Sequence, residues 1–586
     1  MPFFPTVRAA PYMKSVTDTF LGLDRRMKIP EGAFSDMENL TSSYYPLLSN
    51  RDRRGTVMNL KNPKALLQKK KLVLLDDDRL YFGGEDITSY LHEKGCFIDH
   101  DGKKQLVSFG AYIVLFPDML YLNTEDFSDC GSLEAVFEAG GAAVTFSMCR
   151  ADGEAVDAPA VGSTAPENPG NGARWIDTAV SPHVLKTYSA EMKMWVEDLT
   201  VYVKLSCTGI GKNFSPLDGV TISGCTGEAE SLDGHHILTD TGEDFLIFPG
   251  LIHSIFTAEN ANIKVVRSVP ELDFVTEAEN RLWGCKYGLV NGKTVNEIYA
   301  SALGDFKNWN RFEGISTDSY RASVGTDGAF TGAVTFLGHP VFFKENCLHK
   351  VFISAVGAHS IAMTACRGVQ KGSEKSLAIV NETLFFKSVT DICAYDGSLP
   401  VSVSEPLGQA LYTDAAAGAV GGKYYISMKD EKGSFHLFVF DTQKGFWHRE
   451  DGTHAAAFAK AGDELYFADA DRNLLMAVRG SVGVPEDTVR WCAETGIIGC
   501  GTVEQKYVSR LNLRMRLPKG SFCDMFIEYD SDGLWIPMGH IEGKGTDTFM
   551  LPLRPRRCDH FRFKIVGEGD VRVFSFSKIL ETGSDA

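Results

Sequence analysis

The sequence predicts a mainly β fold: a β-propeller with an inserted small β domain and a C-terminal β-sandwich. The composition favours strands and tight turns, because the chain has 57 Gly, 38 Phe and 19 Tyr residues. Short aromatic segments recur about every 40 residues, which is the length of a four-stranded propeller blade. Alternating apolar and polar residues near the C-terminus predict strands with one face in solvent.

Length and charge narrow the class of protein. At 586 residues, 44% of them apolar, the chain can form two to four domains. Its formal net charge of -17 argues against an open basic surface that grips nucleic acid. The one basic run, Lys69–Lys71, is interpreted as a strand start before the apolar Leu72–Leu75 and the acidic turn Asp76–Asp78. The basic run is therefore interpreted as part of the fold and not as a nucleic-acid-binding patch.

Cysteine usage and the N-terminus indicate the compartment. Thirteen Cys without a CxxC pair favour idle thiols in a reducing cytosol over a zinc ribbon or a disulfide framework. The opening MPFFPTVRAAPYMKS lacks the apolar run of a secretory signal. No segment offers the roughly 18 apolar residues of a membrane span. A soluble protein without a membrane span is therefore expected.

The N-terminal third is expected to hold an arm and the first blades. Residues 1–35 include Pro2, Pro5 and Pro11 and the pair Phe3–Phe4, which suit an extended arm with apolar anchors. The first propeller blades are expected over 36–132, where RLYFGG places Tyr81 and MLYLNT places Tyr121, 40 residues later.

The period is then interrupted over 133–270, where an inserted β domain is expected. A loop rich in Pro and Gly near 159–170 precedes KMWVEDLTVYVKLSC, which is interpreted largely as one strand. Two adjacent histidines, His235 and His236, would point to opposite faces of a strand. They are therefore interpreted as solvent or core residues and not as a metal site.

The remaining blades are expected over 271–490. The aromatic repeat resumes at Phe342, Phe385, Tyr425 and Tyr466, in steps of 43, 40 and 41 residues. These rings are interpreted as strand packing. Residues 491–586 are expected to form the C-terminal β-sandwich, because YVSRLNLRMRLP, MFIEYD and HFRFKIVG alternate with period two.

Motifs that carry chemistry are missing from the sequence. There is no GxSxG, HExxH or GxGxxG, and no carboxylate pair stands out. Gly292-Lys293-Thr294 ends like a phosphate loop, but Tyr287 stands where that loop needs Gly, so a turn is favoured. Asp530–Gly533 is interpreted as a hairpin turn. No catalytic, cofactor-binding or metal-binding residue and no cofactor is assigned.

Two further groups are interpreted structurally, with functional alternatives. Asp469, Asp471 and Asn473 resemble the start of a calcium loop, but the sixth and twelfth positions hold Leu474 and Gly480 instead of Gly and Glu. An inter-strand turn is therefore favoured. The cationic run Arg554–Arg557 is interpreted as a surface salt-bridge network, with docking to an acidic partner as the alternative.

Several stretches resemble the propeller-bearing tail structural proteins of tailed bacteriophages and prophages, including tail nozzle and tail-tube proteins. The stretches that carry the likeness are GLDRRMKIPEGAFSDMENLTSSYYPLLSNRDRRG, KKQLVSFGAYIVLFPDMLYLNTED, ENRLWGCKYG with IYASALGDFKNW, and FDTQKGFWHRED. The resemblance implies a non-enzymatic virion tail protein, assembled in the host cytoplasm, that forms a homo-oligomeric ring. Its implied partners are other virion proteins (portal, tail adaptor, tail fibres) and passing DNA, which it would connect, seal or conduct without sequence-specific binding.

Two alternatives to this function remain open from the sequence. One is a host-surface glycan-binding tail module, in which the terminal sandwich holds sugar on exposed aromatic residues such as Trp535. The other is a polysaccharide hydrolase on a propeller scaffold.

Overall fold

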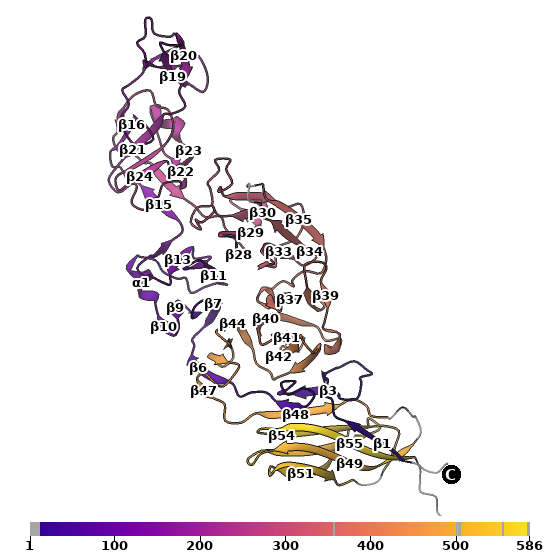
Figure 1. Cartoon of the computed structure of the whole chain (residues 1–586). Helices are drawn as coiled ribbons and strands as arrows, with labels where there is room; N and C mark the ends of the chain where they lie inside the picture. Colours follow the sequence, from indigo (N-terminus) through magenta and orange to yellow (C-terminus); the bar gives the residue numbers. More distant parts are fainter. Residues whose placement is uncertain (1–11, 355–357, 500, 502–504, 554–555, 583–586) are drawn as a thin grey trace, which may run out of the picture.

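The computed structural model describes residues 12–354, 358–499, 501, 505–553 and 556–582. Its secondary structure is almost entirely β, as the composition predicted. Figure 1 shows a ring of small sheets in the middle of an elongated molecule, with an insertion at one end and large C-terminal sheets at the other. Among the described residues, no helix has the length and apolar character needed to cross a membrane.

Seven antiparallel units of four strands form the ring, and we call them blades 1 to 7 in chain order. Their strands are β7 (Pro63–Gln68), β8 (Leu72–Asp76), β9 (Arg79–Phe82), β10 (Glu85–Asp86); β11 (Gln105–Phe109), β12 (Tyr112–Phe116), β13 (Leu120–Asn123), β14 (Cys130–Ser132); β28 (Phe274–Ala278), β29 (Arg281–Val290), β30 (Lys293–Ala300), β31 (Tyr320–Ser323); β32 (Gly332–Phe336), β33 (His339–Lys344), β34 (Cys347–Phe352), β35 (Ser360–Ala365); β36 (Ala378–Val380), β37 (Thr383–Lys387), β38 (Ile392–Tyr395), β39 (Val401–Ser402); β40 (Tyr412–Val420), β41 (Lys423–Asp430), β42 (Phe435–Asp441), β43 (Phe446–Arg449); and β44 (Ala455–Ala461), β45 (Glu464–Asp469), β46 (Leu474–Ala477), β6 (Gly55–Asn59).

Hydrophobic clusters join every blade to the next and so close the ring. For example, Trp283 of blade 3 packs with Phe342 of blade 4, and Phe343 of blade 4 packs with Phe386 of blade 5. The remaining blade pairs also share clusters, including a small one between blades 7 and 1. The first strand of each blade lies toward the centre, beside the first strand or the adjoining turn of its neighbours. Small sheets arranged radially around a central channel are the architecture of a β-propeller.

Blade 7 is completed by a strand from the opposite end of the chain. Strand β6 pairs with β46, so a segment near residue 57 forms the outer strand of a blade built mainly from residues 455–477. This pairing covers an otherwise open sheet edge and ties the two ends of the ring together. β47 (Val484–Pro485) pairs on the far side of β6.

The aromatic period is present, but it falls on different strands in the two halves. Tyr81 and Tyr121 lie in the third strands of blades 1 and 2, whereas Phe342 and Phe385 lie in the second strands of blades 4 and 5. The side chain of Phe342 is fully buried. The interpretation of the two phenylalanines as packing residues is thus confirmed. The period missed blade 3, because the long segment 301–319 between β30 and β31 displaces the next repeat.

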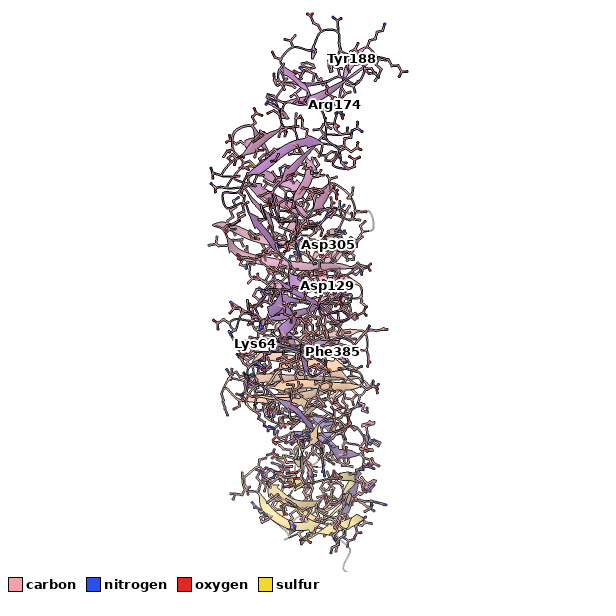
Figure 2. All side chains as sticks on the ribbon, turned by 90° about the vertical axis from the view of Figure 1, so that its left-hand side faces the viewer. Lys64, Asp129, Arg174, Tyr188, Asp305 and Phe385 are labelled. Atoms are coloured by element: carbon pink, nitrogen blue, oxygen red, sulfur yellow. The ribbon has the colours of Figure 1, made fainter. Side chains whose placement is uncertain are left out.

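The strands of the insertion pair only with one another among the described residues. They form three sheets: β15 (Ala135–Glu138), β27 (Lys264–Arg267), β22 (Gly219–Ser223), β23 (Gly234–Ile237); β24 (Asp240–Gly242), β25 (Phe245–Pro249), β21 (Tyr202–Ser206), β16 (Val144–Cys149), β26 (Phe256–Ala258); and β17 (Ala160–Gly162), β18 (Arg174–Asp177), β19 (Val184–Ser189), β20 (Met194–Glu197). Figure 2 places Arg174 and Tyr188 of the third sheet at the tip of the molecule.

One predicted strand in the insertion is wrong. KMWVEDLTVYVKLSC divides into β20 and β21, which belong to different sheets. The break lies at Asp198, whose carboxylate accepts hydrogen bonds from the backbone N–H and the hydroxyl of Thr200. Such a local turn competes with strand pairing.

The C-terminal strands belong to two sheets, and N-terminal strands join both. The first sheet contains β1 (Tyr12–Thr17), β4 (Leu40–Thr41), β5 (Leu48–Asn50), β49 (Lys506–Leu517), β52 (Gly545–Leu551), β53 (Arg557–Cys558) and β55 (Arg572–Thr582). The second continues from blade 6 through β2 (Gly22–Leu23), β3 (Ala33–Glu38), β48 (Arg490–Thr495), β54 (Phe561–Glu568), β50 (Phe522–Tyr529) and β51 (Ile536–Glu542). Both sheets contribute to one hydrophobic core.

Short helices connect these sheets. They are α1 (Thr88–Glu93), which links blades 1 and 2, and three 3-10 helices: η1 (Gly227–Leu232) in the insertion, η2 (Glu374–Ser376) before β36, and η3 (Glu405–Leu407) before β40. Of these, η2 matters for the cavity described below. It directly precedes β36, which is the shortest of the seven innermost strands, and it contacts the innermost strands of blades 4 and 6.

Candidate ligand site in the axial cavity

The ring encloses a cavity of about 630 Å3. Residues at or next to the inner strand of every blade line it: Ala65, Gln105, Phe274, Ala333, Leu377, Ala417 and Ala457. Four of these are alanines, so the strands leave space near the axis that larger side chains would fill. The volume lies within the range of small-molecule sites, about 300–1,000 Å3.

The charged residues of the cavity come from segments just before the inner strands. Lys103 and Lys104 precede β11, whereas Lys371, Glu374 and Lys375 precede β36. A second hollow of about 310 Å3 adjoins the first and shares four of these five residues, all except Lys371. Lys64 of blade 1, labelled in Figure 2, lines this second hollow.

Two of the lysines are neutralised by carboxylates. Lys104 Nζ lies 2.8 Å from Asp118, and both side chains are almost fully buried. Lys103 Nζ lies 2.6 Å from Glu374 Oε1. Because Lys103 precedes blade 2 and Glu374 precedes blade 5, this ion pair bridges non-neighbouring blades.

Lys375 makes a second bridge of a different kind. Its ammonium group donates to the backbone carbonyl oxygens of Lys64, at 3.0 Å, and Ala456, at 3.1 Å. The side chain remains accessible to water in the cavity. Surrounding protein nevertheless desolvates the ammonium group and lowers its pKa; Lys103 and Lys64 add to the lowering, and Glu374 opposes it.

The cavity thus contains more ammonium groups than the carboxylates of the described residues neutralise. Among the described residues, Lys64, Lys371 and Lys375 have no carboxylate within ion-pair distance. The other acid of the larger cavity, Asp273, is engaged by Lys286 Nζ at 3.0 Å and by the backbone N–H of Tyr287 at 2.8 Å. Unpaired ammonium groups in a partly enclosed space favour an anionic ligand.

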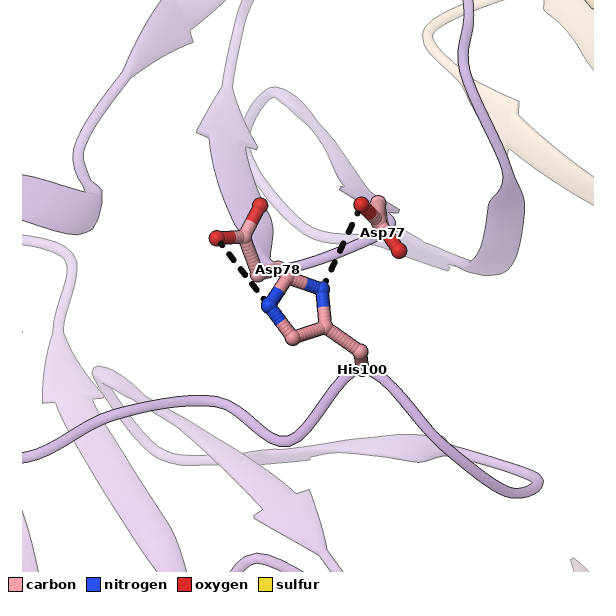
Figure 3. A group of neighbouring side chains, drawn as sticks. All are labelled: Asp77, Asp78 and His100. Carbon is pink, nitrogen blue, oxygen red and sulfur yellow. Dashed lines mark ion pairs between the residues drawn. The ribbon is translucent and has the colours of Figure 1, made fainter.

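A separate group of possible metal ligands lies in blade 1 (Figure 3). Asp77 and Asp78 form the β8–β9 turn, and His100 follows from the segment after α1. His100 Nδ1 lies 3.4 Å from Asp77, and its Nε2 lies 3.9 Å from Asp78. The two carboxylates face different ring nitrogens, so this geometry suits an imidazole between two acids better than three ligands converging on one ion.

The turns predicted from the sequence are found where they were expected. Asp469 accepts hydrogen bonds from the backbone N–H groups of Asp471 and Arg472, which closes the turn between β45 and β46. Asp471 also lies 2.8 Å from His454, a residue of the second hollow. Gly292 lies in the β29–β30 turn with a φ of 77°. Asp530–Gly533 lies between β50 and β51.

The other residues singled out in the sequence are occupied by local contacts. His235 and His236 lie in β23; His235 is exposed, whereas His236 contacts Leu232 O at 2.8 Å. The ring of Trp535 has Arg562 and Lys564 over it, at 5.5 and 5.3 Å.

The two basic runs singled out in the sequence lie in a turn and among local side-chain contacts. Lys69–Lys71 lies in the turn before β8 and not at the start of the strand. Within the cationic run, Arg556 pairs with Asp532 at 3.3 Å, and Arg557 contacts Tyr507. Arg554 and Pro555 lie outside the described residues.

Sequence reasoning missed the axial cavity, because no motif marks its lysines. They come from segments far apart in the chain and meet only when the ring closes. A weak signal is present, however. Alanines recur near the start of several inner strands, as in PKALLQ, TGAVTF, DAAAGAV and HAAAFAK.

Similarity to known proteins is found among solved structures. No protein-family model matches the chain, and no curated protein is significantly similar to it. Among solved structures, it is similar to an exo-β-1,3-galactanase from Phanerochaete chrysosporium (8% identity, TM-score 0.22, covering 52% of this chain and 94% of that one). It is also similar to apo AztD from Citrobacter koseri (11%, 0.26, 74% and 96%) and to an engineered GH43 glycoside hydrolase with endo-xylanase and exo-arabinofuranosidase activity (10%, 0.19, 53% and 96%).

These findings correct the function predicted from the sequence. Two of the three structures are glycoside hydrolases, which are enzymes, and none is a phage tail protein. They contradict the prediction of a non-enzymatic virion tail ring. We therefore retain neither the tail function nor the prediction that the chain is not an enzyme. Identities of 8–11% and TM-scores below 0.3 do not transfer any reaction or substrate to this chain.

Proposed function

We propose that the chain binds an anionic small molecule in its axial cavity. The observation that carries the proposal is the set of three lysines, Lys64, Lys371 and Lys375, which line the adjoining hollows and have no carboxylate partner in the part of the chain that the structure describes. The ring supports them from different blades, so the site depends on the closed fold. Residues 491–586, which supply strands to both C-terminal sheets, would form a sandwich that braces the ring through the sheet continuous with blade 6.

The ammonium groups differ in how firmly hydrogen bonds to the protein hold them, and we assign them different roles on that ground. Lys375 is fixed by two carbonyl oxygens and presents its charge in a defined place. Lys371 is exposed, as is expected of a side chain that moves toward a ligand. Each close ion pair at partial exposure contributes on the order of 1 kcal/mol, so two of them change affinity by roughly tenfold or more.

A binding screen tests this proposal. Small carboxylates, sulfates and phosphates are compared with neutral analogues of the same carbon skeleton by isothermal titration calorimetry, and each bound mixture is then checked for products by mass spectrometry. We expect the anions to bind with one site per chain. The double variant Lys64→Gln/Lys371→Gln should weaken binding by tenfold or more.

The matched control is Lys293→Gln/Lys519→Gln, which removes the same charge from two exposed positions, the first residue of β30 and the turn before β50. Equal losses in both double variants would show that net charge, and not the cavity, governs binding. Absence of one-site binding for every anion would refute the proposal.

A further inference from the structure

We propose that the ligand of the axial cavity is an amphipathic anion, such as an aryl carboxylate or sulfonate, with its charged group at the lysines and its apolar body against the aromatic wall. This inference rests on the proposed function and adds the chemical class of the ligand. It comes from the unequal chemistry of the two adjoining hollows.

The larger cavity has an apolar wall. Phe274 and Tyr287 of blade 3 and Phe458 of blade 7 line it, together with Leu66 and Leu377. All five side chains are only half-buried, so each offers apolar surface to an enclosed space. Burying such surface against a ligand contributes about 25 cal/mol per Å2. A purely polar ion would leave this wall unused.

The described lining of the smaller hollow is mostly polar or small instead. Its lining beyond the shared residues includes Lys64, Asp414 and His454, together with small residues such as Ala456. Lys429 lies 3.8 Å from Asp414, and Asp471 lies 2.8 Å from His454. Polar groups therefore gather on one side of the shared residues and aromatic groups on the other.

The shared residues define where the charged group of the ligand would lie. Lys375 belongs to both hollows, and Lys371 lies four residues before it, in the lining of the larger one. Glu374 lies between them in the sequence but is paired with Lys103. A single anionic group near Lys371 and Lys375 can thus contact ammonium groups while the rest of the molecule extends toward Phe274 and Phe458.

Neutral and cationic ligands fit this arrangement less well. A neutral aromatic molecule would bury the apolar wall but leave the ammonium groups of Lys371 and Lys375 without a counter-charge. A cation would meet like charge at the same place. The structure therefore favours ligands that satisfy both sides at once.

Two fluorescent probes with the same ring systems separate the contributions. The probes are 1-anilinonaphthalene-8-sulfonate, which is an anion, and N-phenyl-1-naphthylamine, which lacks the sulfonate. We expect the sulfonate to bind the intact chain at one site at least tenfold more tightly than the amine. Lys64→Gln/Lys371→Gln should remove most of this difference, whereas Lys293→Gln/Lys519→Gln should preserve it.

The apolar wall is tested with Phe274→Ser and, as a milder change, Leu66→Ser. Either variant that keeps the wild-type melting temperature should weaken both probes by about threefold or more, because both share the ring systems. Inorganic sulfate, added as a competitor, should displace the sulfonate probe only weakly.

The outcomes distinguish this inference from the proposed function. If both probes bind equally and the wall variants weaken both, the cavity is a binding site but the anion requirement is wrong. If the wall variants have no effect and inorganic sulfate competes fully, the apolar part is wrong. If no cavity variant changes the binding of either probe, the proposed function itself is refuted.

Discussion

Closure of the ring depends on a buried arginine next to the strand that completes blade 7. Arg54 directly precedes β6 and has a side-chain exposure of 1%. Its guanidinium group lies 2.6 Å from Glu450 and 2.8 Å from Asp451, and it donates to the hydroxyl of Thr453 at 2.8 Å. These three partners lie between blades 6 and 7, so one side chain ties the N-terminal strand to the last part of the ring.

The change Arg54→Met should loosen this closure. Removing one partner of a buried ion pair costs about 3–5 kcal/mol, because the remaining carboxylates stay desolvated. Asp451 retains a side-chain exposure of 19%, so the lower end is expected, about 3 kcal/mol. This corresponds to roughly 100-fold faster amide hydrogen exchange in β6 and β46, measured by mass spectrometry under conditions where exchange reports the opening equilibrium.

The matched control is Arg53→Met, which changes the exposed neighbouring arginine. An increase in exchange for Arg54→Met no larger than that of Arg53→Met would refute the closure argument. A second variant, Arg54→Met/Asp451→Asn, should recover part of the loss, because it removes one of the two buried carboxylates that then share only Arg51 as an ion-pair partner.

The same network predicts a pH dependence. Burial alone would raise the pKa of Asp451, but Arg54, the Thr453 hydroxyl and Arg51 together lower it well below its usual range. A carboxyl group with a lowered folded pKa stabilises the fold above its unfolded pKa of about 4 and loses this contribution as the pH falls toward the folded value. The difference in exchange between wild type and Arg54→Met should therefore shrink below about pH 4.

Two further predictions concern the blades. Gly368→Ala should lower the melting temperature by several degrees, because an added Cβ would lie 1.8 Å from Lys344 O; Gly325→Ala, with no atom within 4 Å of its Cβ position, should leave it nearly unchanged. Burial, with Lys344 nearby, lowers the pKa of His349 to about 4. Because the folded state then binds fewer protons than the unfolded state, stability should fall by up to about 3 kcal/mol between pH 6.5 and pH 4. His349→Gln should flatten this part of a pH series of denaturant melts; equal slopes in both proteins would contradict the expectation.

Local sequence patterns predicted the elements of this fold better than their assembly. The alternation Leu511, Leu513, Met515, Leu517 follows the buried face of β49 in the structure, since period two alone decides which side chains face the core. The 40-residue period located most blades. It could not reveal that Tyr81 lies in the third strand of its blade whereas Tyr466 lies in the second strand of its own.

Contacts between distant segments were beyond the reach of such patterns. Nothing local in residues 55–59 indicates that they pair with β46, more than 400 residues later. The cavity lysines show this more clearly. Lys103 and Lys371 line the same cavity only because the ring closes. The family resemblance, which no comparison tests, implied a function that the solved structures contradict.

The most direct test of the axial site is a structure of the chain with 1-anilinonaphthalene-8-sulfonate bound. We expect one probe inside the ring, with its sulfonate within hydrogen-bond distance of Lys371 or Lys375 and its rings against Phe274 or Phe458. A probe found only outside the ring, with the axial cavity holding solvent alone, would contradict this expectation.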